Sequence, residues 1–137
     1  VGCGELLHLD EYVSKKLWMA EEYGKLLANT PGVITPKTKS GVKNVFWMYA
    51  ILIDQNEFGM SKDELREALA QRGIETRDFF YAPNDQPILQ SCIPVGEQFP
   101  NTQLIAHTGL YLPSGLALTK EQIVFVCEAV NELSEHN

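Results

Sequence analysis

Histidine and cysteine are the side chains of this sequence whose types most often perform nucleophilic or metal chemistry. The chain contains three of each: His8, His107, His136, Cys3, Cys92 and Cys127. The histidines share no HxH, HxxxH or HExxH spacing, and the cysteines form no CxxC pair. This pattern predicts neither a metal site nor a disulfide framework. Cys92 and His107 are not part of any sequence motif that is typical of a hydrolase. We therefore expect no catalytic residue in this chain.

The balance of charge limits the partners that the chain can bind. Its 137 residues include 18 acidic residues against 11 lysines and arginines, which gives a formal net charge of -7. This sign is unfavourable for binding a nucleic-acid backbone. The longest apolar run, Val45–Ile53, is too short to cross a bilayer, and the first residues lack the pattern of a secretory signal. We therefore expect a cytoplasmic protein without nucleic-acid or membrane partners.

Apolar spacing indicates the elements that must position any functional residue. From Leu6 onward apolar residues recur at helical spacing, which predicts a long amphipathic helix ending near Ala28. Trp18 lies beside this apolar stripe, and an exposed apolar face there would favour self-association. The run 44–53 is apolar on both alternating faces and predicts a central strand buried on both sides. We expect the aromatic and sulfur-containing side chains of 46–49 to serve packing.

Capping signals and breakers place the remaining elements. Ser61 and Glu64 stand at capping-box spacing and predict a helix over 62–72, with Gly73 at its C-terminal cap. The other predicted elements are a strand at Ile74–Arg77, a fixed loop over 82–87, a short helix at Pro100–His107, a strand at Leu110–Leu112 and a C-terminal helix after the capping pair Thr119 and Gln122. Together they predict a single α+β domain over residues 1–137, with three or four mostly antiparallel strands packed with helices.

Several segments, taken in order, resemble one family. They are 6–13 (LLHLDEYV), 20–23 (AEEY), 47–49 (WMY), 63–66 (DELR), 73–80 (GIETRDFF), 99–102 (FPNT), 109–115 (GLYLPSG) and 118–123 (LTKEQI). In this order they resemble the C-terminal part of the DegT/StrS family of pyridoxal-phosphate (PLP)-dependent sugar aminotransferases, in its perosamine-synthase-like branch. The resemblance covers nearly the whole chain. It implies the small C-terminal domain of a fold-type-I PLP aminotransferase.

The resemblance also implies what residues 1–137 lack. In complete family members a larger N-terminal domain carries the lysine that forms the Schiff base with PLP, the acidic partner of the pyridine nitrogen and most phosphate contacts. We expect none of the eight lysines here to be that amine, because they fall on a polar helix face, on a loop and at helix starts. The chain alone is therefore expected to hold no cofactor and to be inactive.

By the same resemblance, possible substrate contacts fall in one segment. Arg77 would pair with an anionic diphosphate or a carboxylate, Tyr81 would pack against a sugar or base ring, and Gln86 would bond a sugar hydroxyl. Asn84 stands where the family usually has a histidine, and we include it among the substrate-binding residues.

A structural interpretation of the same segment is the alternative. In it, Arg77 pairs with Asp78 or Glu75, and the rings of Phe79 and Phe80 fill the core. The sequence alone leaves both interpretations open.

Two functions follow from the resemblance and the predicted fold. The first is the C-terminal part of a nucleotide-sugar aminotransferase, which transfers an amino group from glutamate to a keto-sugar nucleotide. This part would contribute substrate-lid and dimer surfaces, through a homodimer or through association with a large aminotransferase domain. The alternative is a freestanding α+β binding or dimerisation module without catalysis.

Overall fold

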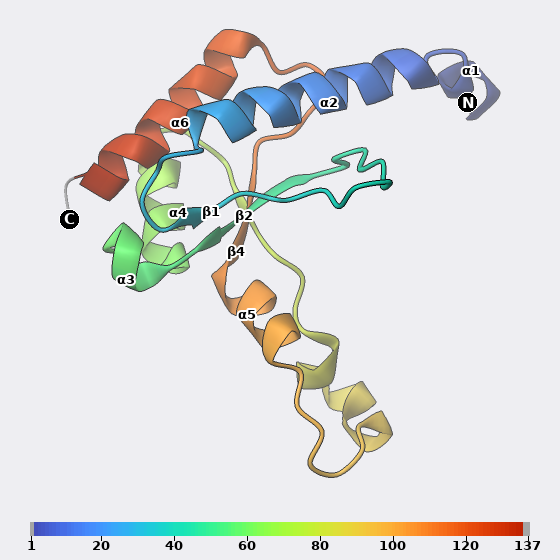
Figure 1. The fold of residues 1–137 in the computed structure, drawn as a ribbon, viewed down its shortest axis with the longest axis vertical. Helices are drawn as coiled ribbons and strands as arrows, with labels where there is room; N and C mark the ends of the chain where they lie inside the picture. Colours follow the sequence, from blue (N-terminus) through green and yellow to red (C-terminus); the bar gives the residue numbers. More distant parts are fainter. Residues whose placement is uncertain (1, 136–137) are drawn as a thin grey trace.

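A computed structural model describes residues 2–135, in which four short strands form one antiparallel sheet covered by helices (Figure 1). The strands are β1 (Val33–Ile34), β2 (Tyr49–Ile53), β3 (Arg77–Asp78) and β4 (Gly109–Leu112). Their spatial order is β1-β2-β4-β3, and every neighbouring pair is antiparallel. The α+β class and the antiparallel sheet predicted from the sequence are confirmed. His136 lies outside the described residues.

Helices of very different length surround this sheet. They are α1 (Gly2–Leu6), α2 (Leu9–Leu26), α3 (Gln55–Phe58), α4 (Lys62–Gln71), α5 (Pro100–Thr108), α6 (Lys120–Glu135) and two short 3₁₀ helices, η1 (Pro83–Asp85) and η2 (Pro87–Cys92). The long helices α2 and α6 pack against each other (Figure 1). Within residues 2–135, every helix is too short or too polar to cross a membrane.

The hydrophobic core lies between the sheet and the helices α2, α4 and α6. Tyr49, Ile51 and Ile53 of β2 are buried at alternate positions, as the two-residue period of a strand requires. The ring of Tyr23 on α2 stacks on Tyr49 with 4.8 Å between the ring centroids. Burial raises the pKa of the Cys127 thiol beside them to about 12, so this cysteine is a packed, unreactive residue.

Local capping forms α4 as the sequence predicts. The Ser61 side chain accepts a hydrogen bond from the Glu64 amide, and the Glu64 carboxylate accepts one from the Ser61 amide. Gly73 follows the helix with a φ of +76°, a conformation that glycine adopts without strain. The capping box therefore fixes the helix start, and Leu65 and Leu69 carry its buried face.

The central strand is shorter than predicted. The predicted strand over 44–53 begins only at Tyr49, because Pro113 follows β4 and has no N–H to continue the ladder. Before it, Phe46 has a φ of +46° and packs against the core, whereas Trp47 is 68% exposed. The prediction that this whole run is buried is wrong, and Trp47 does not serve packing.

Two further boundaries and one side chain differ from prediction. The first helix is interrupted at Leu7 and His8, which divides it into α1 and α2. Ile74 packs in the core after α4, and the strand expected there begins at Arg77. Trp18 is partly buried against the core, with the Lys15 amine 5.5 Å from its ring centre, so its side chain does not form an exposed apolar face. The short elements β1 and α3 were not predicted.

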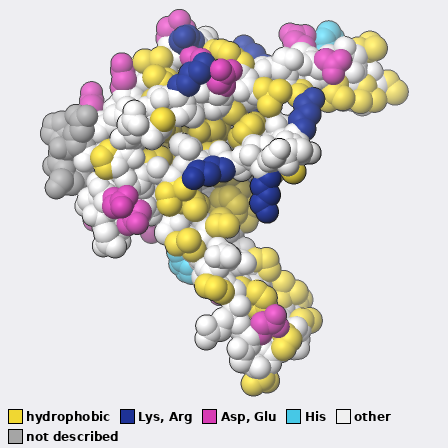
Figure 2. Space-filling model, viewed as in Figure 1, with side chains coloured by type: hydrophobic (Ala, Val, Ile, Leu, Met, Phe, Trp, Pro, Cys, Tyr) yellow, Lys and Arg dark blue, Asp and Glu magenta, His cyan; other side chains and the backbone are white. Residues whose placement is uncertain are grey.

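Residues 79–108 form an arm that projects from the rest of the molecule, which we call the body (Figure 1). The arm contains η1, η2 and α5, and none of these helices has a buried residue. Apolar side chains cover much of its surface (Figure 2). The exposed ones are Phe80, Tyr81, Ile88, Leu89, Val95, Leu104 and Ile105. The interpretation in which Phe80 fills the core is therefore wrong.

Candidate functional site

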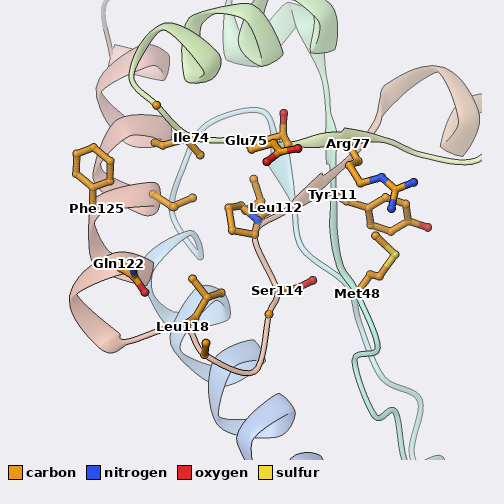
Figure 3. Close-up of a pocket in the computed structure, with 16 residues that line it drawn as sticks. Met48, Ile74, Glu75, Arg77, Tyr111, Leu112, Ser114, Leu118, Gln122 and Phe125 are labelled. Atoms are coloured by element: carbon orange, nitrogen blue, oxygen red, sulfur yellow. The ribbon is translucent and has the colours of Figure 1, made fainter.

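Arg77, the cation expected to bind substrate, lies on the edge strand β3 and pairs with Tyr111 of β4. Both side chains line a cleft of about 660 Å³ between the end of β4 and α6 (Figure 3). Its other walls are mostly apolar, with Ile74, Leu118 and Phe125 opposite the arginine (Figure 3). Glu75 lines the cleft between Ile74 and Arg77, so the cleft has one corner with a cation and a carboxylate beside mostly apolar walls.

Two side chains of α2 hold the rim of this cleft in place. The Lys16 amine donates hydrogen bonds to the backbone carbonyls of Trp47, at 2.9 Å, and of Ser114. The Tyr23 hydroxyl donates to the carbonyl of Pro113 at 2.8 Å. Burial lowers the pKa of Lys16. Lys16 thus links α2 to the rim of the cleft. The helical spacing predicted that Lys16 lies on the polar face of the helix, but its amine is partly buried.

A second hollow of about 350 Å³ adjoins the first, and it brings Arg77 close to Tyr81. Arg66 of α4 and Tyr111 line it as well. The structure therefore joins two of the four predicted substrate residues in one place and adds a second arginine. Cation and aromatic ring together suit a ligand that carries both an anionic group and a planar or sugar ring.

The alternative pairing of Arg77 with Asp78 is wrong. The Asp78 carboxylate binds the Lys62 amine at 2.9 Å and the Arg66 guanidinium at 2.5 Å. These two cations, Lys62 first, hold the pKa of Asp78 below its ordinary value. Within residues 2–135 Arg77 has no ion-pair partner, so its charge is available to a ligand.

An aromatic cluster supports this corner of the sheet. The Phe79 ring stacks on Tyr111 with 5.0 Å between centroids, and the Phe80 ring meets it edge-on at 6.0 Å. Burial raises the pKa of the Tyr111 hydroxyl, while the charge of Arg77 acts in the opposite direction. The arm therefore joins the body through rings that also form the wall of the second hollow.

Asn84 and Gln86 lie away from this hollow, on the arm. The Asn84 amide donates to the Asp85 carboxylate at 3.2 Å, and that carboxylate accepts a second bond from Gln103 of α5 at 2.6 Å. The Asn84 side-chain oxygen is buried without a hydrogen-bond partner. Gln86 is exposed. The Asp85 carboxylate thus links η1 to α5 and also accepts the bond from Asn84, and the structure does not bring Asn84 or Gln86 to Arg77.

Sequence reasoning missed Arg66 and Tyr111 as members of the site. Arg66 is four residues after Lys62 on α4, so the two cations share a helix face directed at Asp78. That spacing was the available signal. Tyr111 carries no such signal, because its place beside Arg77 depends on the register of β3 and β4.

Two lysine amines of the described residues are partly shielded from solvent and bonded to other groups. Lys16 and Lys62 are the amines shielded from solvent, and both are already engaged, Lys16 by two carbonyls and Lys62 by Asp78 and Asp63. Neither is poised to form a Schiff base. In the described part of the chain, histidine, cysteine and carboxylate side chains also form no cluster that could hold a metal.

Comparison with known proteins identifies relatives along almost the whole chain. The profile of the DegT/DnrJ/EryC1/StrS aminotransferase family matches residues 1–131. GDP-perosamine synthase of Escherichia coli O157:H7 is 30% identical over 132 residues, which cover 96% of this chain and 34% of that protein. The dTDP-3-amino-3,4,6-trideoxy-alpha-D-glucose transaminase of Streptomyces venezuelae is 30% identical and is covered to 33%.

Solved structures agree with these sequence matches. DesV of S. venezuelae, in complex with a ketimine intermediate, superposes with a TM-score of 0.84 at 29% identity, over 95% of this chain and 34% of that one. DesI, solved in the presence of its TDP-sugar product, has a TM-score of 0.81 at 24% identity over 94% of this chain and shows the same fold. This chain spans about a third of the length of these relatives.

Proposed function

We propose, because this chain belongs to the DegT/DnrJ/EryC1/StrS aminotransferase family, that it is the C-terminal part of a PLP-dependent nucleotide-sugar aminotransferase. The complete enzyme would transfer an amino group from glutamate to a keto-sugar nucleotide. Two sugar-nucleotide transaminating relatives at 30% identity support this substrate class. Because they are about three times as long, the chemistry would require a large domain beyond these residues.

In this proposal the chain contributes the wall and lid of a substrate site. The observation that carries it is the hollow in which Arg77, free of ion pairs within residues 2–135, meets the 84%-exposed ring of Tyr81. Arg77 would neutralise the diphosphate, and Tyr81 would cover a sugar or base ring. Gln86 and Asn84 would approach the sugar only if the arm closes over it.

PLP, when bound in the complete enzyme, supplies the carrier that takes the amino group from one substrate and gives it to the other. The residues of this chain would bind and orient the sugar nucleotide and exclude water around it. Since its two shielded lysines are engaged, the chain alone is expected to bind no PLP and to show no transamination.

A freestanding binding or dimerisation module is the second candidate. The observation that favours it is a core whose central side chains are fully buried within residues 2–135. A domain with such a core is able to fold without a second domain.

A chimera tests the proposed function. The C-terminal third of the E. coli GDP-perosamine synthase is replaced by this chain, and amination of its keto-sugar nucleotide by glutamate is measured. We expect an active enzyme in which Arg77→Ala raises KM for the sugar nucleotide on the order of tenfold, because a charge-assisted contact to the diphosphate is lost. Arg72→Ala removes a surface arginine paired with Glu132 and serves as the matched control.

PLP absorbance and the circular dichroism of the chimera establish that it is folded. A folded, PLP-loaded chimera without activity, or one in which Arg77→Ala and Arg72→Ala behave alike, contradicts the substrate role. For the isolated chain, chemical shifts of the Arg77 and Tyr81 resonances on addition of GDP provide a measurement that does not depend on the chimera.

A further inference from the structure

The cleft between the end of β4 and α6 differs in its charges from the neighbouring hollow. The hollow is lined by Arg66 and Arg77, and the carboxylate of Asp78 beside them is already bound by two cations. The cleft is lined by Arg77 and Glu75, one charge of each sign. An anion therefore suits the hollow, but in the cleft it would lie close to the Glu75 carboxylate. The two sites are thus suited to ligands of different classes.

The two charges of the cleft are not used by the protein itself. Within residues 2–135 neither Glu75 nor Arg77 has an ion-pair partner, and they do not pair with each other although they are two residues apart. Both residues are exposed, so each charge on its own binds an ion only weakly. A ligand with a carboxylate and an ammonium group would engage both charges at once.

The hydroxyl of Thr76, which stands between these two residues, is also available. Its oxygen is buried and has no hydrogen-bond partner within residues 2–135, although Thr76 lines the cleft. Buried polar atoms of folded proteins are nearly always bonded, because an unmade bond costs free energy. A hydroxyl can donate to a carboxylate and accept from an ammonium group. Thr76 can therefore bond to the charged end of the same ligand.

An apolar wall faces the charges across the cleft. Leu118 and Phe125 lie opposite Arg77 (Figure 3). Phe125 is 52% exposed, whereas Ile123 and Val126 on the same helix are buried. Its ring is free to pack against an apolar or aromatic group. The volume of about 660 Å³ lies within the range of about 300–1,000 Å³ that is usual for small-molecule sites.

We propose that this cleft binds a free α-amino acid with a large apolar side chain, such as phenylalanine. The carboxylate of the ligand pairs with Arg77, its ammonium group pairs with Glu75, and its side chain packs on Leu118 and Phe125. Only a free amino acid carries both charges on one carbon atom, because the end residue of a peptide has one of them. Glutamate is unsuited to the site, since its second carboxylate would face the apolar wall.

The inference does not rest on the proposed function, although the cleft and the hollow share Arg77. A ligand in the cleft occupies the charge that the proposed function assigns to a diphosphate. The amino acid and a sugar nucleotide are therefore expected to compete, so that each raises the apparent Kd of the other.

Titration of the purified chain, followed by the amide resonances of Glu75, Thr76 and Phe125, tests the site. L-Phenylalanine is expected to shift these resonances in a saturable way. Phenylpropanoate lacks the ammonium group, phenylalaninamide lacks the carboxylate, and L-alanine lacks the ring. Each of the three is expected to bind roughly tenfold more weakly or worse, because one of the contacts is lost.

Variants of the two charged residues test the pairing. Glu75→Gln and Arg77→Gln are each expected to weaken phenylalanine binding on the order of tenfold. Glu67→Gln and Arg72→Gln are the matched controls, because Glu67 and Arg72 are exposed and lie outside the walls of the cleft. Circular dichroism of each variant establishes that it is folded.

Phe125→Ala tests the apolar wall. It is expected to weaken the binding of phenylalanine and to leave the weaker binding of alanine unchanged, since alanine does not reach the ring. The half-exposed position of Phe125 makes unfolding of this variant an unlikely cause of a loss.

Three results would overturn the inference. They are the absence of saturable shifts in the cleft, equal affinity for phenylalanine and phenylpropanoate, and equal behaviour of Glu75→Gln and Glu67→Gln. A chain that binds phenylalanine but not GDP supports the inference and contradicts the substrate role of the hollow. A chain that binds GDP but not phenylalanine has the opposite meaning.

Discussion

The body and the arm of this molecule differ in how their apolar residues are used. In the body, side chains from β2, β4, α2, α4 and α6 converge on one core whose central members are fully buried. In the arm, Ala82 is buried, but η1, η2 and α5 have no buried residue and several large apolar side chains are exposed. Internal packing therefore stabilises the body, whereas the arm exposes apolar surface that is available for a contact with another molecule.

The largest expected effect is the difference in stability lost when an apolar side chain is truncated in the body or in the arm. Ile51→Ala removes a fully buried side chain of β2 and is expected to lower the free energy of unfolding by about 2–5 kcal/mol. Ile88→Ala makes the same kind of truncation on the arm, at an 82%-exposed position, and is expected to change it by less than about 0.5 kcal/mol. Urea denaturation of both variants measures the difference. Equal losses would mean that the arm shares the core.

A substitution at Gly109, where the arm meets β4, is expected to have an intermediate effect on stability. A methyl group at Gly109 would lie 2.5 Å from the Ile105 carbonyl oxygen and 2.8 Å from the Phe79 Cβ. Gly109→Ala is therefore expected to cost about 1–3 kcal/mol of stability, through overpacking where the arm meets β4. Gly115→Ala is the control, since its added methyl group would have no neighbour within 4 Å. Thermal denaturation of both compares them, and unchanged stability of Gly109→Ala would show that the joint yields easily.

The smallest effect concerns pH and the edge strand. Because Lys62 and Arg66 lower the pKa of Asp78 in the folded state, its contribution is present above the ordinary aspartate pKa of 3.8 and is lost as pH falls through the lower folded value. The Asp78 side chain is 42% exposed, so after solvent screening we expect less than about 1 kcal/mol. Comparing acid denaturation of Asp78→Asn with that of the unmodified chain tests this. If both lose stability equally on acidification, these ion pairs contribute nothing.

Local signals explain which parts of the fold were predictable. The capping boxes at Ser61 and Thr119 identified helix starts because the side chain and amide that bond are three residues apart. The start of β2 at Tyr49 was not predictable from its own apolar run, because it is set by Pro113, which is far away in the sequence. The two-residue strand β1 exists only through its pairing with β2, so no periodicity reveals it.

The candidate site divides in the same way. The resemblance directed attention to Arg77 and Tyr81, and the structure places both in one hollow. The same reasoning could not show that Asp78 is occupied by two other cations, because that depends on how α4 packs beside β3. Asn84 was grouped with them because it stands where the family usually has a histidine, but its amide donates to the neighbouring Asp85, which links η1 to α5 through Gln103.

The two ends of the arm lie next to each other. The Phe79 amide donates to the Gly109 carbonyl at 3.2 Å, directly beyond the last residue pair of β3 and β4. In the sheet, β3 and β4 form a hairpin, and the residues between them are its long loop. The entropy cost of closing such a loop rises by only about 0.6 kcal/mol for each doubling of its length. Insertions, deletions or wholesale replacement of this segment would thus leave the strand register intact. Evolution could therefore replace the arm, and with it the surface that the arm offers to a ligand, while the fold of the body stays the same.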